Sequence, residues 1–120
     1  MSSTATQADV PRHSELVDER LVRWFLYAAL TFLLISMLGG ILMALQLVHW
    51  NPLTQIELFS AGRWRMIHTN AVAYGFLANA FLGVLHWAVP RLTFQPVASR
   101  KIAYFIFFAW QAIVLSTAAG

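Results

Sequence analysis

Residues 66–89, MIHTNAVAYGFLANAFLGVLHWAV, contain no Asp, Glu, Lys or Arg, and this stretch decides the fold. A helix needs about 20 apolar residues to cross a hydrocarbon core about 30 Å thick, so the stretch can span a bilayer with some tilt. Uncharged runs also extend from Trp24 to Val48 and from Ile102 to Gly120. The sequence therefore predicts an all-α membrane protein with three transmembrane helices.

The composition agrees with a membrane protein and excludes several other classes. Of the 120 residues, 59% are hydrophobic and only 11% are charged, whereas about a quarter of a soluble domain is charged. The absence of Cys excludes disulfides, thiolate metal sites and a covalently attached c-type haem. The net charge of +3 does not indicate nucleic-acid binding, because the basic residues are scattered at the ends of the apolar segments and form no patch.

The chain divides into a polar N-terminal tail, residues 1–21, and a transmembrane bundle, residues 22–120, with spans at about 22–48, 66–89 and 102–120. The tail lacks the basic n-region and cleavage site of a signal peptide. We expect a partly disordered leader at the membrane surface or in the cytoplasm. Asn51-Pro52 predicts a turn in the first loop. Pro90 predicts the end of the second helix, because a residue before proline is disfavoured in the α region.

The basic residues predict the orientation of the spans, because cytoplasmic loops carry an excess of Lys and Arg. Six basic residues fall on the side of the N-terminus and two on the other, which places the N-terminus in the cytoplasm. Aromatic side chains are expected to form a belt at each interface. The residues of the cytoplasmic side are Arg12, Arg20, Arg23, Arg91, Arg100 and Lys101, with Trp24, Tyr27, Trp87 and Tyr104; those of the outer side are Arg63 and Arg65, with Trp50 and Trp64.

His68 is the candidate functional residue, because an ionisable side chain inside a membrane helix is costly and suggests a function. Imidazole is a frequent axial ligand of haem iron, although an intramembrane His also serves as a hydrogen-bond donor or proton relay. On an ideal helix, small and polar residues lie within about 60° of the His68 direction. These residues are Val72, Gly75, Asn79, Leu82, Gly83 and His86.

Two interpretations of this face remain open. In the first, glycines allow close helix packing and the Asn hydrogen-bonds across the helix interface. In the second, a flat macrocycle lies against the small residues, with Gly75 facing it, and His68 binds its iron. The two are compatible, because helix bundles build cofactor sites on their inward faces.

The other histidines do not complete a metal site with His68. His68 and His86 cannot bind one iron, because eighteen residues separate them by about 27 Å along a helix. His86 and His49 are interpreted as interface residues, so a second axial ligand is expected from outside this chain. Arg65 lies nearly one turn from His68 toward the outer surface, where its guanidinium could pair with haem propionates or with lipid headgroups.

The run from Gly62 to Phe76, GRWRMIHTNAVAYGF, resembles the catalytic subunit I of cbb3-type cytochrome c oxidases, the C-family haem-copper oxidases. The second helix of that family opens with a G-R-x-R-x-x-H-T-N-A-V pattern. The likeness continues at Asn79-Ala80 and in the third span, where FAWQAIVL from Phe108 is similar to the family's G-W-Q-A-V-I-V-L, and it covers about Val22 to the end. A departure is LHWAVP at residues 85–90, which replaces the family's Tyr-and-basic ending of this helix.

The resemblance implies that the chain is the start of the helical bundle of a haem-copper oxidase subunit I. His68 would be one axial ligand of the low-spin haem b, its iron ligand, and Arg65 would lie near the haem propionates. The high-spin haem, copper and the catalytic tyrosine are expected only in later helices, so these residues alone lack the binuclear active site. We expect a respiratory terminal oxidase of the bacterial inner membrane that reduces oxygen to water and pumps protons.

The partners implied are the remaining helices of subunit I, other oxidase subunits including c-type cytochromes, and the lipid bilayer. Two other functions stay open. One is the large subunit of the related nitric-oxide reductase, which shares the second-helix histidine but lacks the histidine-linked tyrosine farther along the chain. The other is a small, non-catalytic membrane protein with a structural or assembly role, which predicts a stable isolated fold without haem. We expect residues 1–120 alone to bind haem weakly or not at all.

Overall fold

The computed structural model describes residues 13–50, 55–57 and 60–119, so most of the predicted tail and the Asn51-Pro52 turn lie outside the described residues. The described part is helical and contains no strand. Its elements are α1 (His13–Leu16), α2 (Glu19–Leu47), α3 (Ala61–Asn70), the π-helical segment η2 (Ala71–Leu77), α4 (Ala78–Thr93) and α5 (Arg100–Ala119).

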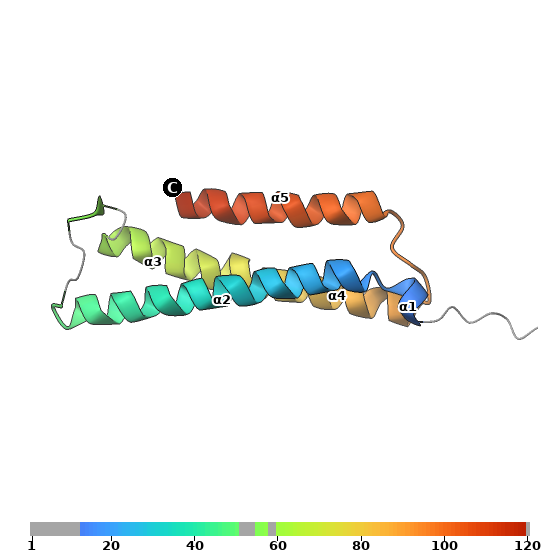
Figure 1. Ribbon diagram of the computed structural model, residues 1–120, viewed down its shortest axis with the longest axis horizontal. Helices are drawn as coiled ribbons and strands as arrows, with labels where there is room; N and C mark the ends of the chain where they lie inside the picture. Colours follow the sequence, from blue (N-terminus) through green and yellow to red (C-terminus); the bar gives the residue numbers. More distant parts are fainter. Residues whose placement is uncertain (1–12, 51–54, 58–59, 120) are drawn as a thin grey trace, which may run out of the picture.

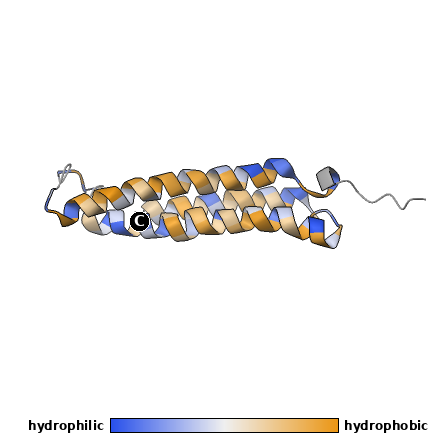
Figure 2. Ribbon diagram, turned by 90° about the horizontal axis from the view of Figure 1, so that it is seen from below, coloured by the Kyte–Doolittle hydropathy of each residue, from blue (hydrophilic) through white to orange (hydrophobic). Residues whose placement is uncertain are grey.

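Three helices are long and apolar enough to cross a membrane: α2, the continuous helix formed by α3, η2 and α4, and α5. They run side by side along the long axis of the molecule, with α2 against the second span (Figure 1). Hydrophobic residues make up most of the length of the three helices, and hydrophilic residues gather mainly toward the two ends (Figure 2). Many of the large hydrophobic side chains are exposed. The prediction of an all-α protein with three membrane-spanning helices is confirmed.

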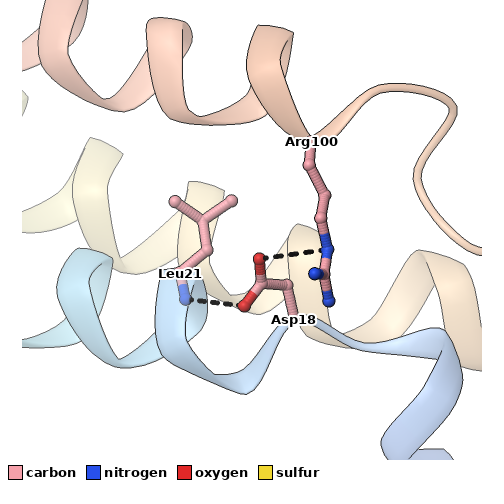
Figure 3. Close-up of polar contacts among 3 residues, drawn as sticks. All are labelled: Asp18, Leu21 and Arg100. Carbon is pink, nitrogen blue, oxygen red and sulfur yellow. Dashed lines mark hydrogen bonds and ion pairs between the residues drawn. The ribbon is translucent and has the colours of Figure 1, made fainter.

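The first and third spans are tied together where each begins. Asp18 is the N-cap of α2: its Oδ1 accepts a hydrogen bond from the Leu21 backbone N–H at 3.3 Å, which satisfies one of the free donors of the first turn. Its Oδ2 lies 3.6 Å from Nε of Arg100, the first residue of α5 (Figure 3). Leu16 and Val17, which the sequence assigned to the polar tail, are buried. The boundary expected at residue 21 therefore falls inside α2.

The sequence predicted that the second span ends at Pro90, and this prediction is wrong. α4 continues through Pro90 to Thr93, and Phe94 ends it in the left-handed conformation with φ 54°. The restriction before proline is a preference against the α region rather than a prohibition, and proline-containing helices are its exception. The residue that terminates the helix is the left-handed one after its last turn.

Buried residues of the second span recur at steps of four: Ala71, Gly75, Asn79 and Gly83. In an α-helix of 3.6 residues per turn each such step drifts by about 40°. A π turn holds more residues, because its hydrogen bonds join residues five apart, and η2 therefore offsets part of this drift. The sequence predicted a regular α-helix here, and the π-helical segment is what keeps the small residues on the face that contacts α2.

Candidate functional site

The imidazole of His68 lies against α2, in the last turn of α3. Its Nδ1 is 2.7 Å from the carbonyl oxygen of Ser36 and 3.1 Å from the Ser36 hydroxyl, and Ser36 itself is buried. A carbonyl oxygen only accepts hydrogen bonds, so Nδ1 carries the hydrogen and donates it. The neutral ring then has its free electron pair on Nε2.

Two glycines of α2 make room for this ring. A Cβ on Gly40 would lie 3.1 Å from His68 Cε1, and a Cβ on Gly39 would lie 3.1 Å from Cε3 of Trp64 and 3.6 Å from the His68 Cβ. Sequence reasoning did not single out Ser36, Gly39 or Gly40. The signal was available, because a Gly-Gly pair with a Ser nearby in a transmembrane helix is typical of close contact with another helix.

The hydrogen bonding of the His68 ring is of the kind found in histidines that bind metals. Histidines that bind metals usually donate their other ring N–H to a carbonyl or carboxylate, which fixes the tautomer and raises the basicity of the ligating nitrogen. In this protein the Ser36 carbonyl accepts that hydrogen bond from Nδ1 of His68. In the part of the chain that the structure describes, no three His, Cys, Asp or Glu side chains could hold a metal ion together. His68 thus offers one imidazole ligand, which matches the requirement of one side of a haem iron.

The two arginines near His68 point to different neighbours. Arg63 donates from Nη2 to the Ala119 carbonyl of α5 at 2.7 Å. Arg65 is exposed and lines an open hollow of about 570 Å³ between the end of α2 and the start of α3. The other residues of the hollow are Met43, Gln46, Leu47, Ala61 and Gly62. Of the two guanidinium groups, that of Arg65 is placed to receive an anionic group.

Gly75 is covered by α2. A Cβ at this position would lie 2.5 Å from Cγ and 2.6 Å from Cβ of Phe32, so no larger residue fits without a backbone shift. The contact favours the first interpretation of the small-residue face, close helix packing. In this arrangement Gly75 offers no surface to a flat ligand.

Asn79 is fully buried and joins the second span to the third. Its Nδ2 donates to the Gly75 carbonyl at 2.7 Å and to Gln111 Oε1 at 3.2 Å, while its Oδ1 accepts from Gln111 Nε2 at 2.6 Å. Next to this pair, Trp110 Nε1 donates to the Tyr74 carbonyl at 3.0 Å. The expected hydrogen bond of Asn79 across a helix interface is confirmed.

His86 and His49, the two histidines interpreted from the sequence as interface residues, lie apart from His68 along the bundle. His86 stacks on Phe25 with ring centroids 5.1 Å apart, and its Nδ1 donates to the Leu82 carbonyl at 2.7 Å. His49 is exposed just beyond the end of α2, with φ 61°. The structure thus brings neither histidine into the surroundings of His68 that Ser36, Gly39 and Gly40 form.

Comparison with known families identifies the setting of this site. Residues 20–120 match the family described as cytochrome C and quinol oxidase polypeptide I. The chain belongs to this family. His68, Ser36, Arg65 and Asn79 all lie within the matched residues, so the candidate site is part of the oxidase polypeptide and the chain is a membrane protein.

Two curated relatives agree with this assignment. The chain is 28% identical, over 109 residues and 91% of its length, to a cytochrome c oxidase subunit 1 homolog from Agrobacterium tumefaciens (strain T37). It is 32% identical, over 101 residues and 82% of its length, to the cbb3-type cytochrome c oxidase subunit CcoN1 of Stutzerimonas stutzeri. The matches cover 20% and 21% of these relatives, so the chain spans about a fifth of their length. No solved structure matches the chain significantly.

Proposed function

We propose that this chain supplies one axial ligand, His68, to a low-spin haem b in subunit I of a respiratory terminal oxidase. One observation carries the proposal: the 2.7 Å hydrogen bond from Nδ1 to the Ser36 carbonyl holds the ring inside the bundle and leaves Nε2 with its electron pair. Membership of the oxidase family supports it. When bound, a haem supplies one-electron chemistry that no side chain of this protein provides.

The residues around His68 have distinct roles in this proposal. The Ser36 carbonyl orients the imidazole, and Gly39 and Gly40 leave the space that the ring and Trp64 occupy. Arg65, which lines the hollow, would hold a haem propionate, since a guanidinium matches a carboxylate with two parallel hydrogen bonds. Gly75 acts as a close-contact position that lets Phe32 pack against the second span.

The rest of the activity is proposed for the whole subunit. In the complete subunit this haem would take part in electron transfer from a c-type cytochrome, and the remaining helices would hold the high-spin haem and copper at which oxygen is reduced, with proton pumping. The chain resides in the bacterial inner membrane with its N-terminus in the cytoplasm. The count of six basic residues against two supports this orientation. At the proposed inner end, Arg20 lies over Trp24 at 5.1 Å and Arg91 over Trp87 at 4.4 Å, as expected for residues at an interface.

The visible spectrum of the complete subunit tests the assignment. His68→Ala is expected to abolish the low-spin haem b signal in the reduced-minus-oxidised spectrum. His86→Ala is the matched control, because His86 packs on Phe25 toward the other end of the span. A low-spin signal that survives in His68→Ala would show that the iron has a different ligand.

The oxidase is favoured over the alternatives raised by the sequence. Both relatives described above are cytochrome c oxidase proteins, and no observation favours the nitric-oxide reductase or a non-catalytic assembly protein.

A further inference from the structure

The backbone of η2 skips one carbonyl in its hydrogen-bond ladder. The Ala78 N–H bonds to the Ala73 carbonyl, five residues back. When the ladder returns to the four-residue spacing of α4, one of the next two carbonyls has no backbone donor. These are the carbonyls of Tyr74 and Gly75, and each receives a side-chain donor, from Trp110 Nε1 and Asn79 Nδ2 respectively.

Such donors decide the backbone conformation inside a membrane. No water reaches a carbonyl in the hydrocarbon core, and one left without a donor costs several kcal/mol. Asn79 lies in the middle of the span and is fully buried, and its remaining amide hydrogen and oxygen are engaged by Gln111. The π turn and its donors therefore form one unit that includes a residue of α5.

This unit lies between two fixed contacts of the second span. On one side His68 is held by Ser36. On the other, Gly83 lies against α2, where a Cβ would be 3.1 Å from Cβ of Phe25. If residues 71–77 became α-helical, the two halves of the span would rotate relative to each other by one residue, about 100°. Such a rotation would break at least one of the two contacts as the structure has them.

We propose that Asn79 is a positioning residue for His68: by holding the Gly75 carbonyl in the π turn, it sets the direction in which the imidazole leaves the helix. The inference rests on the proposed function for the use of His68 as a haem ligand. The register of the helix is independent of haem, so it is testable separately.

Cross-linking in membranes that contain the complete subunit, with any cysteine outside residues 1–120 replaced, measures this register. Gly39→Cys/His68→Cys reports the outer half, because the two Cβ positions are 3.6 Å apart, and Phe25→Cys/Gly83→Cys reports the inner half at 3.1 Å. These spacings are close to the 3.5–4.5 Å of Cβ atoms in disulfides. With a membrane-permeable oxidant, both pairs are expected to cross-link within the chain. Failure of either pair in the otherwise unchanged chain would overturn the proposal.

Asn79→Leu is then expected to lower the yield of at least one cross-link several-fold. Asn70→Leu is the matched control on the same helix, since Asn70 makes no side-chain hydrogen bond in the part of the chain that the structure describes. Gln111→Leu separates helix pairing from control of the backbone, because it leaves the bond from Asn79 to Gly75 intact. We expect both cross-links to persist in Gln111→Leu and to stay impaired in Asn79→Leu/Gln111→Leu.

A deletion supplies the rescue that a general loss of folding would not allow. Removing Ala73 takes out the additional residue of the π turn, so Asn79→Leu with this deletion is expected to regain both cross-links. In the holoenzyme, Asn79→Leu is expected to shift the electron paramagnetic resonance signal of the low-spin haem, and the deletion to restore it. The proposal is contradicted if the cross-links are unchanged in Asn79→Leu or if they recover in Asn79→Leu/Gln111→Leu. It is also contradicted if deletion of Ala73 does not restore the cross-links in Asn79→Leu. If Asn79→Leu alters the cross-links as expected but the complete subunit binds no haem through His68, only the proposed function is refuted.

Discussion

At the scale of single residues, the backbone carbonyl of Ser36 fixes the tautomer and the orientation of the His68 ring. The ring donates through Nδ1 to the Ser36 carbonyl of α2, which leaves the free electron pair on Nε2. The sequence identifies His68 through its rarity in an apolar helix, but it does not identify Ser36. The two residues are 32 positions apart, and a backbone carbonyl leaves no mark in the residue type. The partner of an imidazole thus becomes visible only when the helices are packed.

Gly40→Ala tests whether the space beside His68 is needed. The new Cβ would lie 3.1 Å from Cε1, so the ring must move while Nδ1 is held by Ser36. Overpacking of this kind costs about 1–3 kcal/mol, and the better helix propensity of Ala offsets roughly 1 kcal/mol of it. We expect an altered low-spin haem signal in the complete subunit. A low-spin haem spectrum of Gly40→Ala identical to that of the unchanged subunit would show that the ring does not need this space.

Arg65→Gln tests the role of the hollow at the outer end. A positive charge beside a propionate favours the reduced haem, so its removal is expected to lower the midpoint potential of the low-spin haem. Redox titration of the complete subunit measures this shift. Arg63→Gln is the control, since Arg63 is bonded to the Ala119 carbonyl, and we expect a smaller shift there. A larger shift in Arg63→Gln would assign the propionate to the other arginine.

At the scale of elements, the second span carries the features that the sequence predicted least well. An ideal helix placed Gly75, Asn79 and Gly83 near the direction of His68, and all three are buried against other helices. The sequence did not predict how they come to share a face. Buried residues that recur every four positions drift around an α-helix, and the π turn that offsets this drift has no local signal in the sequence. The end of the helix was also misplaced, because a left-handed Phe94 ends α4 and Pro90 does not.

Gly75→Ala tests the closest contact between α2 and η2. The methyl group would lie 2.5 Å from Cγ of Phe32, and Cβ of Phe32 is 2.6 Å away, so a rotamer change cannot relieve the clash. We expect a loss of about 1–3 kcal/mol in the free energy of unfolding, measured by detergent titration of the purified protein in mixed micelles. Gly62→Ala serves as the control for stability, because a Cβ at this position would have nothing within 4 Å. Equal stability of the two variants would mean that the helices are farther apart than described here.

At the scale of the whole molecule, the spacing of charges was sufficient to predict three spans. Uncharged runs of membrane length and basic residues at their ends require only composition and helix geometry. The motif around His68 suggested the oxidase family, and the match over residues 20–120 shows it. The relative rotation of the spans depends on side-chain contacts between them, which is why the surroundings of His68 needed the structure.

Accessibility of single cysteines tests the proposed orientation. Ser60 precedes α3 and Gln95 follows α4, and both are exposed. Because the chain has no Cys of its own, Ser60→Cys and Gln95→Cys can be labelled separately with a membrane-impermeant maleimide. We expect Ser60→Cys to react from the periplasmic side and Gln95→Cys only after the inner membrane is permeabilised. The reverse pattern would place the N-terminus outside.

Replacing the His68 side chain with free imidazole tests whether His68 binds the iron of the low-spin haem. In the complete subunit, His68→Gly removes the ring and leaves a space beside Ser36, Gly39 and Gly40. The measurement is the low-spin haem signal of this variant with and without added imidazole. We expect the signal to be lost in His68→Gly and to return as imidazole is added. A signal that persists undiminished without imidazole would contradict it.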